Sequence, residues 1–223
     1  MSHLETIEVE TGPNPTAAVI MLHGLGADGN DFVPLARELQ LTGAGSVRFI
    51  FPHAPVIPVT INNGMRMRAW YDILGFELVR REDEAGLRES LVAVEELLAQ
   101  QKLRGIAPRR TVLAGFSQGC AMALMAGVRH GERLAGIAGL SGYLPLASLT
   151  AVERNEAHVS TPVFMAHGRQ DNVVPLNRGT ASRDALQALG YTVEWHDYEM
   201  AHSVCPQEVG DLNKWMLKVL SDT

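Results

Sequence analysis

The sequence predicts an α/β fold in which a mostly parallel central sheet is covered by helices on both faces. Short apolar runs alternate with longer helical patterns along the whole chain. These runs are nearly continuous, which is typical of parallel strands buried on both faces. The chain has 223 residues, 46% hydrophobic and 20% charged, and this length and composition suit one large α/β domain.

The segments expected to be strands are apolar runs bounded by turn residues. In chain order they lie over residues 17–24, 46–52, 111–115, 134–142, 162–168 and 192–198. We find no internal repeat, low-complexity stretch or linker that would divide the chain. Residues 1–223 are therefore expected to form a single domain with no separate cap domain.

The segments expected to be helices repeat apolar side chains every three or four residues. In chain order they lie over residues 31–40, 83–101, 117–130, 176–189 and 206–220. Gly105 closes the second of these helices. The helix over 117–130 is expected to place one apolar stripe against the core, formed by Ala121, Leu124, Met125 and Val128.

One segment, residues 52–81, breaks the alternation of strands and helices. It contains several prolines and the turn sequence Asn-Asn-Gly, and a connection of this length in a compact domain is usually functional or disordered. It also carries too many large apolar side chains for a free linker: Met65, Met67, Trp70, Ile73, Leu74 and Phe76. We therefore expect this loop to form a lip over a pocket.

Charge and cysteine content exclude several classes of function. The net charge of −6 and the isoelectric point near 5.7 argue against nucleic acid or anionic membranes as the main partner. The first ten residues carry three glutamates where a signal peptide would be basic, and the apolar run 17–22 is too short to cross a bilayer. Cys120 and Cys205 lack the spacing of a zinc or redox site. We predict a cytoplasmic protein without integral membrane association.

A G-x-S-x-G motif lies between an expected strand and an expected helix, where residues 115–119 read Gly-Phe-Ser-Gln-Gly. A serine on so sharp a turn has an unfavourable backbone conformation, and glycine at the flanking positions avoids steric collision. Short patterns of this kind also occur by chance, and Ser117 in a plain bend is the alternative. The strand before the motif and the helix after it favour Ser117 as a nucleophile.

A serine nucleophile needs a base, usually histidine, and the histidine needs an orienting carboxylate. After this kind of serine turn, the acid precedes the base along the chain. His167 precedes the best acid candidate, and His196 lies inside the expected strand 192–198. His202 follows that strand on a loop, where a base can face the nucleophile. We therefore favour His202, with His196 as the alternative.

Asp171 is the favoured acid because it lies on the loop after the expected strand 162–168. Asp184 falls within a helical pattern, and Asp197 lies in a strand. A solvated turn aspartate is the alternative interpretation of Asp171.

A tetrahedral oxyanion needs two backbone N–H donors, one from the residue after the nucleophile and one from an earlier strand-end loop. Gln118 supplies the first donor. The glycine-rich segment 23–29 follows the first expected strand, and Leu25 is the candidate for the second donor. His23 has no second metal ligand four residues away or nearby, so we expect a structural hydrogen-bonding role for it. We assign no metal and no other cofactor.

Seven short blocks, in order along nearly the whole chain, carry a resemblance to a known family. They are HGLGADG (23–29), FPHAP (51–55), AWYDI (69–73), GFSQGCAM (115–122), LSGYLP (140–145), HGRQDNVVP (167–175) and MAHSV (200–204). The chain resembles the carboxylesterase and acyl-protein thioesterase family, a compact, lysophospholipase-like branch of the α/β-hydrolases. The number and order of the blocks make this match more specific than the serine motif alone.

The resemblance implies an α/β-hydrolase fold and a serine hydrolase that acts on carboxylic esters or acyl thioesters. Its substrate would be a small-molecule ester or an acylated protein. The nucleophile, acid and base of the family correspond to Ser117, Asp171 and His202. The oxyanion donors correspond to Leu25 and Gln118.

The acyl groove of the family corresponds here to Ile73 and Leu74, close to Trp70, with Val174 adjacent. Two departures bear on the fit of this groove: the family commonly has glycine where this chain has Ala201, and the first loop reads Ala27 in place of aspartate. Many members of the family are dimers, so a homodimer is compatible with the resemblance.

Two alternative functions share these residues. One is a non-catalytic member of the fold that binds an apolar ligand, although such a protein has no need of a serine, an aspartate and a histidine in order. The other is an acyltransferase, in which the acyl group passes to an acceptor other than water.

Overall fold

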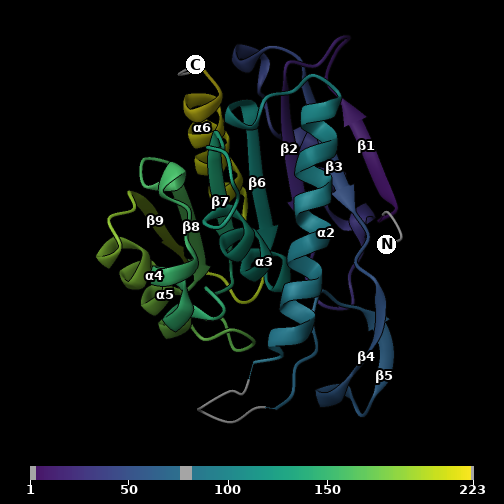
Figure 1. Ribbon diagram of the computed structural model, residues 1–223, viewed down its shortest axis with the longest axis vertical. Helices are drawn as coiled ribbons and strands as arrows, with labels where there is room; N and C mark the ends of the chain where they lie inside the picture. The colour runs from purple at the N-terminus through teal and green to yellow at the C-terminus, as the bar shows by residue number, and fades with distance from the viewer. Residues whose placement is uncertain (1–3, 76–81, 222–223) are drawn as a thin grey trace.

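A central sheet organises the protein, in a computed structural model that describes residues 4–75 and 82–221 (Figure 1). Within those residues the sheet has seven strands in the order β1-β3-β2-β6-β7-β8-β9. The strands are β1 (Thr6–Glu10), β2 (Ala17–Leu22), β3 (Val47–Pro52), β6 (Thr111–Phe116), β7 (Gly136–Leu140), β8 (Val163–Gly168) and β9 (Val193–Tyr198). Only the β1 pairing with β3 is antiparallel. This confirms the predicted mostly parallel sheet.

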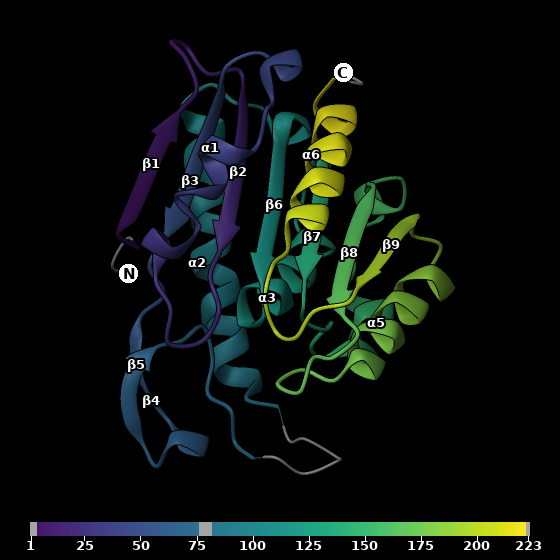
Figure 2. The ribbon, with the colours of Figure 1, turned by 180° about the vertical axis from the view of Figure 1, so that it is seen from behind.

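Helices cover both faces of the sheet, as predicted. The first face is covered by α2 (Glu84–Leu103), α3 (Gln118–Gly127), α4 (Ala147–Glu153) and α5 (Leu176–Ala188) (Figure 1). The second is covered by α1 (Leu35–Glu38) and α6 (Pro206–Ser221) (Figure 2). Alternate side chains of one strand enter the two cores: Ile20 faces α3, whereas Val19 and Met21 lie in the core under α6.

The helix expected over 31–40 is shorter than predicted. The structure has a 3-10 turn over Gly29–Phe32 and then only α1. Pro34 separates the two segments, because proline has no N–H to donate and its ring clashes with the preceding turn of a helix. Asp28 caps the first segment by accepting a hydrogen bond from the Asn30 N–H at 2.7 Å.

The apolar stripe predicted for the helix over 117–130 is too narrow. Helix α3 ends at Gly127, and every one of its residues is buried. It lies between the sheet and α2, so it has no solvent-facing side. A helix that is apolar all round is buried all round, which the four-residue stripe did not capture.

The segment 52–81, expected as a loop, contains a two-stranded antiparallel hairpin formed by β4 (Val56–Val59) and β5 (Met65–Arg68). Asn63 and Gly64 adopt positive φ angles of 55° and 73°, which is the turn chemistry that favours hairpins. The edge strand β1 and helix α4 also had no counterpart among the predicted elements. Phe76, named with this segment, lies outside the described residues.

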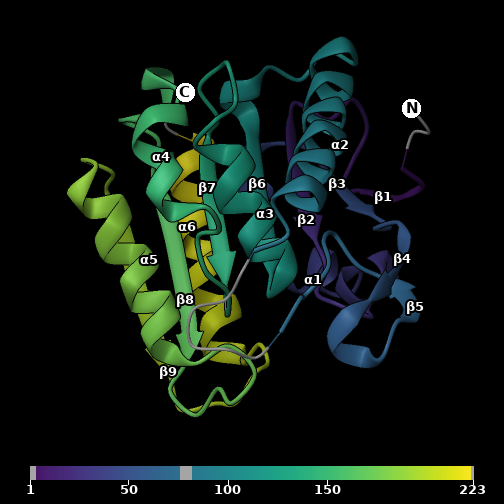
Figure 3. The same ribbon diagram turned by 60° about the horizontal axis from the view of Figure 1, so that its bottom comes forward.

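The carboxyl ends of the parallel strands meet at one edge of the sheet. Figure 3 brings this edge forward, with the β4–β5 hairpin on one side and the loops after β8 and β9 on the other. Loops at this edge of an open parallel sheet form the usual ligand site. In the described part of the chain, no helix has the length and apolar content needed to span a membrane.

Candidate active site

Ser117 lies on the turn between β6 and α3, with φ 57° and ψ −116°. A Cβ atom on Gly115 would lie 2.1 Å from the Gly119 carbonyl oxygen, and one on Gly119 would lie 2.0 Å from the Leu22 carbonyl oxygen. Both glycines are therefore required by close backbone packing around the serine. The strained φ of Ser117 is held by this packing, which is common at functional residues.

The structure brings Ser117, His202 and Asp171 into one hydrogen-bonded chain. His202 Nε2 lies 2.9 Å from Ser117 Oγ, and His202 Nδ1 lies 2.7 Å from Asp171 Oδ2. A carboxylate only accepts, so His202 donates its Nδ1–H to Asp171 and leaves Nε2 free to accept from the serine hydroxyl. The three side chains come from loops after β6, β8 and β9, which meet at the same edge of the sheet.

The competing candidates lie elsewhere. His196 lies in β9, and its Nε2 is 3.0 Å from Glu194 Oε1. Asp184 lies in α5 and pairs with the neighbouring Arg183, and Asp197 contacts the indole N–H of Trp195 at 3.2 Å. None of these three candidates contacts Ser117 in the described structure.

Backbone contacts fix the carboxylate of Asp171. Its Oδ1 accepts hydrogen bonds from the Val173 N–H at 2.9 Å and the Val174 N–H at 2.8 Å, and its side chain is fully buried. His167 Nε2 donates to the Val174 carbonyl at 2.7 Å and lies 3.4 Å from Asp171 Oδ2. Burial lowers the pKa of His167, which keeps the ring neutral beside the acid loop. This supporting role of His167 was not expected from the sequence.

The loops that carry the acid and the base pack directly on each other. The Gln170 N–H donates to the Met200 carbonyl at 3.0 Å, and a Cβ on Gly168 would lie 2.4 Å from the Ala201 carbonyl oxygen. The His202 ring rests on Phe116, with ring centroids 4.8 Å apart. The imidazole is therefore oriented by its carboxylate and by an apolar contact.

The two expected oxyanion donors lie beside the serine. Leu25, in a turn, and Gln118, the first residue of α3, line the same cavity as Ser117. Neither backbone N–H has an acceptor among the described residues. A Cβ on Gly24 would lie 3.2 Å from Ser117 Cβ, which shows how closely the loop approaches the serine. The Gly26 N–H donates to the Arg68 carbonyl at 2.8 Å, so the β4–β5 hairpin holds this loop in place.

His23 has the structural role expected for it. Its Nδ1–H donates to the Gly24 carbonyl at 2.7 Å, and its Nε2 accepts from the Ala54 N–H at 3.0 Å. The side chain is completely buried, and burial lowers its pKa. A neutral histidine thus joins the loop that carries Leu25 to the segment after β3.

Trp70 supports the wall of the site from behind and does not line its cavity. Its indole N–H donates to the His23 carbonyl at 2.8 Å, and its backbone N–H donates to Gln118 Oε1 at 3.0 Å. Gln118 Nε2 donates in turn to the Tyr71 carbonyl at 2.9 Å. Only 1% of Trp70 is exposed. The side chain of Gln118 therefore anchors this segment to the first turn of α3.

A cavity of about 390 Å³ opens at Ser117. Besides Ser117, Leu25 and Gln118 it is lined by Ile61, Tyr71, Ile73, Tyr143, Asn172, Val173, Val174 and Pro175. Ile73 and Val174, two of the four expected substrate-binding residues, lie in this wall. Leu74 is 40% exposed and lines a smaller hollow of about 20 Å³ beyond Tyr71.

Two tyrosines that were not among the candidates from the sequence also line the wall. The hydroxyls of Tyr71 and Tyr143 lie 2.9 Å apart, and the Arg178 guanidinium stacks 3.5 Å from the centroid of the Tyr143 ring. Burial raises the pKa of Tyr71 well above its usual value, so the Tyr71 hydroxyl stays neutral. Tyr71 and Tyr143 lie within the blocks AWYDI and LSGYLP, and this position in the sequence could have identified them as candidates for the site.

Comparison with known proteins places the chain in a family. Residues 4–220 match the phospholipase/carboxylesterase family. The chain belongs to that family. It is 42% identical to acyl-protein thioesterase 1 of Gibberella zeae over 92% of this chain and 91% of the relative. It is 40% identical to acyl-protein thioesterase 1 of Yarrowia lipolytica over 90% of this chain and 91% of the relative.

Solved structures agree with this family and its fold. SOBER1 of Arabidopsis thaliana superposes with a TM-score of 0.86 at 30% identity, over 92% of this chain and 99% of that one. Acyl-protein thioesterase 2 of Zea mays superposes with a TM-score of 0.85 at 29% identity, over 97% and 99% of the two chains. The predicted family, the α/β-hydrolase fold and the assignment as a serine hydrolase enzyme are confirmed.

Proposed function

We propose that this member of the phospholipase/carboxylesterase family hydrolyses carboxylic esters or acyl thioesters through a Ser117, His202 and Asp171 triad and an acyl-enzyme. The hydrogen-bonded chain from Ser117 Oγ through His202 to Asp171 is the observation that supports this mechanism most directly. Such a chain converts an unreactive hydroxyl into a nucleophile without a metal or cofactor.

The reaction begins when Ser117 Oγ attacks the acyl carbon and its proton moves to His202 Nε2. Asp171 holds the imidazole in the reactive tautomer and stabilises the positive charge that forms on it. His202 then gives the proton to the departing alcohol or thiol, which leaves an ester between the acyl group and Ser117. Water attacks this ester by the same route and releases the carboxylic acid.

The N–H groups of Leu25 and Gln118 are proposed to bind the oxygen that becomes negative during each attack. By comparison with other enzymes, each donor contributes roughly 2.7–4 kcal/mol to stabilising the transition state. Both amides lack another acceptor among the described residues, so binding the oxyanion breaks no existing hydrogen bond.

The acyl chain is proposed to occupy the cavity at Ser117, where Ile73 and Val174 supply apolar surface. Residues 52–75 form part of the wall and serve as its lip, with Trp70 as a rigid support behind it and Leu74 at its outer end. The names of the fungal relatives support an acylated protein as substrate, and a small-molecule ester would use the same groups.

Replacing the nucleophile tests the mechanism. In the Ser117→Ala variant we expect hydrolysis of a short-chain aryl ester to fall by about a millionfold, as in other serine triads. The exposed Ser148 provides the matched control, since Ser148→Ala leaves the site intact. A fluorophosphonate should label the wild type and the control covalently and leave Ser117→Ala unlabelled. Near-wild-type hydrolysis by purified Ser117→Ala would refute the assignment.

A hydrolysis panel identifies the substrate class. Aryl esters of increasing acyl length, an acyl-CoA, an S-acylated peptide and a lysophospholipid would be compared by kcat/KM. An acyl-protein thioesterase should hydrolyse the S-acylated peptide faster than the aryl esters of equal chain length. The opposite order would favour a general carboxylesterase on the same triad.

A further inference from the structure

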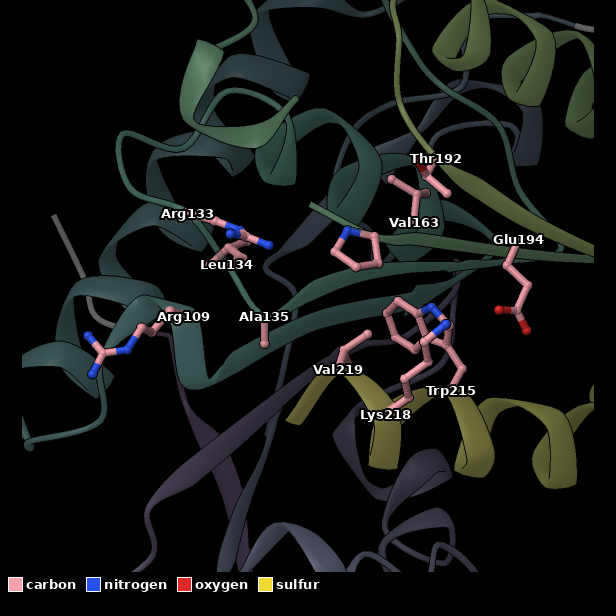
Figure 4. A pocket seen from close by; sticks show the side chains of 11 residues that line it. Arg109, Arg133, Leu134, Ala135, Val163, Thr192, Glu194, Trp215, Lys218 and Val219 are labelled. Atoms are coloured by element: carbon pink, nitrogen blue, oxygen red, sulfur yellow. The ribbon is translucent and has the colours of Figure 1, made fainter. Parts of the chain in front are cut away.

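Figure 4 shows a second cavity, whose volume is about 340 Å³. It lies at the opposite edge of the central sheet from Ser117. It opens where the parallel strands begin: Ala135 precedes β7, Val163 is the first residue of β8, and Thr192 precedes β9. Its volume is within the range of small-molecule sites. None of its lining residues lines the cavity at Ser117, so the two sites are separate.

The floor of this cavity is apolar and mostly buried. It is formed by the side chains of Leu134, Ala135, Pro162, Val163, Trp215 and Val219. Trp215 is 3% exposed and packs closely against β7, where a Cβ on Gly136 would lie 2.5 Å from the indole ring. The indole N–H of Trp215 has no hydrogen-bond partner among the described residues. Trp215 therefore forms the base of the cavity, and its indole N–H is an unused donor there.

The rim of the cavity is cationic. Arg109, Arg133 and Lys218 are exposed, and none of them pairs with a carboxylate in the described part of the chain. Arg133 makes only a long contact of 3.4 Å to the Ser160 carbonyl. This contrasts with a protein of net charge −6 in which many other arginines are ion-paired, Arg129 for example at 2.8 Å from Glu153.

The single carboxylate of the lining is separated from the arginines. Figure 4 shows Glu194 at one end of the cavity, while Arg109 and Arg133 lie at the other, with Arg133 extending over the floor. Glu194 Oε1 also accepts a hydrogen bond from His196 Nε2 at 3.0 Å. The formal charge of the lining is thus +2, from three cations and one carboxylate, and the positive end is open to an anion.

We propose that this cavity binds a small amphipathic anion, with its apolar body on the Trp215 floor and a phosphate or carboxylate group at the cationic rim. An arginine guanidinium matches both groups, because it donates two parallel hydrogen bonds to their oxygens. An apolar body on the floor displaces water from the apolar lining. This binding requires neither Ser117 nor hydrolysis, so it stands apart from the proposed function.

Trp215 reports on binding directly. In ¹⁵N-labelled protein the indole N–H resonances of Trp70, Trp195 and Trp215 are separate probes, and the Trp215→Phe variant assigns the third. Phenyl phosphate or phenylacetate should shift the Trp215 resonance in a saturable way, and the tighter of the two identifies the preferred anionic group. The Trp70 resonance, beside the Ser117 cavity, should stay in place.

Two further ligands test both halves of the proposal. Benzyl alcohol keeps the apolar body without the charge, and inorganic phosphate keeps the charge without the body. We expect each to bind at least about tenfold more weakly than phenyl phosphate, since each loses one of the two kinds of contact. Equal binding of either one would overturn the proposal.

Charge variants locate the site. The Arg133→Gln/Lys218→Gln variant should weaken binding of phenyl phosphate by about tenfold or more. The control, Arg37→Gln/Arg66→Gln, makes the same change of charge at two exposed positions outside the cavity and should bind like the wild type. Thr192→Trp, at an exposed position of the mouth, should block the cavity without touching the core. Equal affinity in all variants, with dispersed spectra that show them folded, would refute the site.

Discussion

The carboxylate of Asp171 makes contacts of two kinds, one with its own loop and one with the candidate base. Asp171 uses one oxygen for the backbone of its own loop and the other for His202. The orienting contact is therefore separable from the contacts that shape the loop.

This separation predicts the behaviour of Asp171→Asn. The asparagine oxygen can still accept from Val173 and Val174, so the loop should fold, but the amide N–H₂ would face His202 and favour the wrong tautomer. We expect turnover of an aryl ester to fall by about 10⁴-fold, as in comparable triads. Asp184→Asn, in the rejected acid candidate, is the matched control and should retain wild-type turnover.

Glu208 is a buried carboxyl group that the proposed mechanism does not use. It lies in the first turn of α6 and is completely buried, and neither of its oxygens has a hydrogen-bond partner among the described residues. Burial raises the pKa of Glu208 to about 8. The neutral acid is favoured in the folded state because an isolated charge there would lose its hydration.

Linkage then gives the sign of a pH effect on stability. In the unfolded chain Glu208 ionises near the ordinary glutamate pKa of 4.5, whereas the folded protein keeps the proton until about pH 8. Its contribution to the free energy of unfolding therefore falls as pH rises from about 4.5 to 8 and levels off above that value. Glu208→Gln should remove this loss and gain stability relative to the wild type by a few kcal/mol between these limits. Denaturant titrations of both proteins at about pH 5 and about pH 9 measure this gain. If the difference in the free energy of unfolding between variant and wild type is the same at both pH values, the assignment is contradicted.

At the scale of elements, the first turn of α3 contacts both the buried strand β2 and the segment that forms the wall of the candidate site. Gly119 lies against the end of β2, and the neighbouring Gln118 holds the segment that begins at Trp70. The position of the helix is thus coupled to the position of the proposed oxyanion donor.

Gly119→Ala should disturb both stability and activity. Its Cβ would lie 2.0 Å from the Leu22 carbonyl oxygen, a rigid backbone atom, so the helix must move. We expect a loss of about 1–3 kcal/mol in the free energy of unfolding and a large drop in kcat. Gly210, inside α6, has nothing within 4 Å of its Cβ position, and Gly210→Ala should stabilise the protein by about 0.5–1 kcal/mol. Urea unfolding of the two variants compares these opposite effects.

The elements also show where sequence reasoning succeeded and failed. Long buried strands and the long helix α2 were predicted well because their apolar periodicity is strong. The helix over 31–40 was overestimated because Pro34 was passed over, and the hairpin was missed although Asn63 and Gly64 marked its turn. Strand β1 is a half-buried edge strand whose apolar alternation is weak. It was therefore not predicted, and only its pairing with β3 in the structure identifies it as a strand.

At the scale of the whole molecule, the two edges of the sheet present two different surfaces. The carboxyl edge carries the serine and its cavity, and the amino edge carries a separate cavity with a cationic rim. Strands β7 and β8 run from one cavity toward the other. Local sequence motifs indicate the chemistry of the first cavity. The second is lined by the beginnings of β8 and β9, the segments before β7, β8 and β9, and α6, and it has no motif.

The sequence by itself predicted the fold class from its alternating strands and helices, and the family from the resemblance of its seven blocks. It also singled out Ser117, Asp171 and His202 as candidates, because motif context and chain order restrict which side chains can meet. The tertiary structure alone decided that Trp70 lies behind the cavity, that Tyr71 and Tyr143 line it, and that Arg109, Arg133 and Lys218 line a second cavity. The physical reason is that a sequence motif reflects the backbone conformation that neighbouring residues of the chain must adopt. A cavity depends on which side chains from distant segments share a wall, and only packing fixes that.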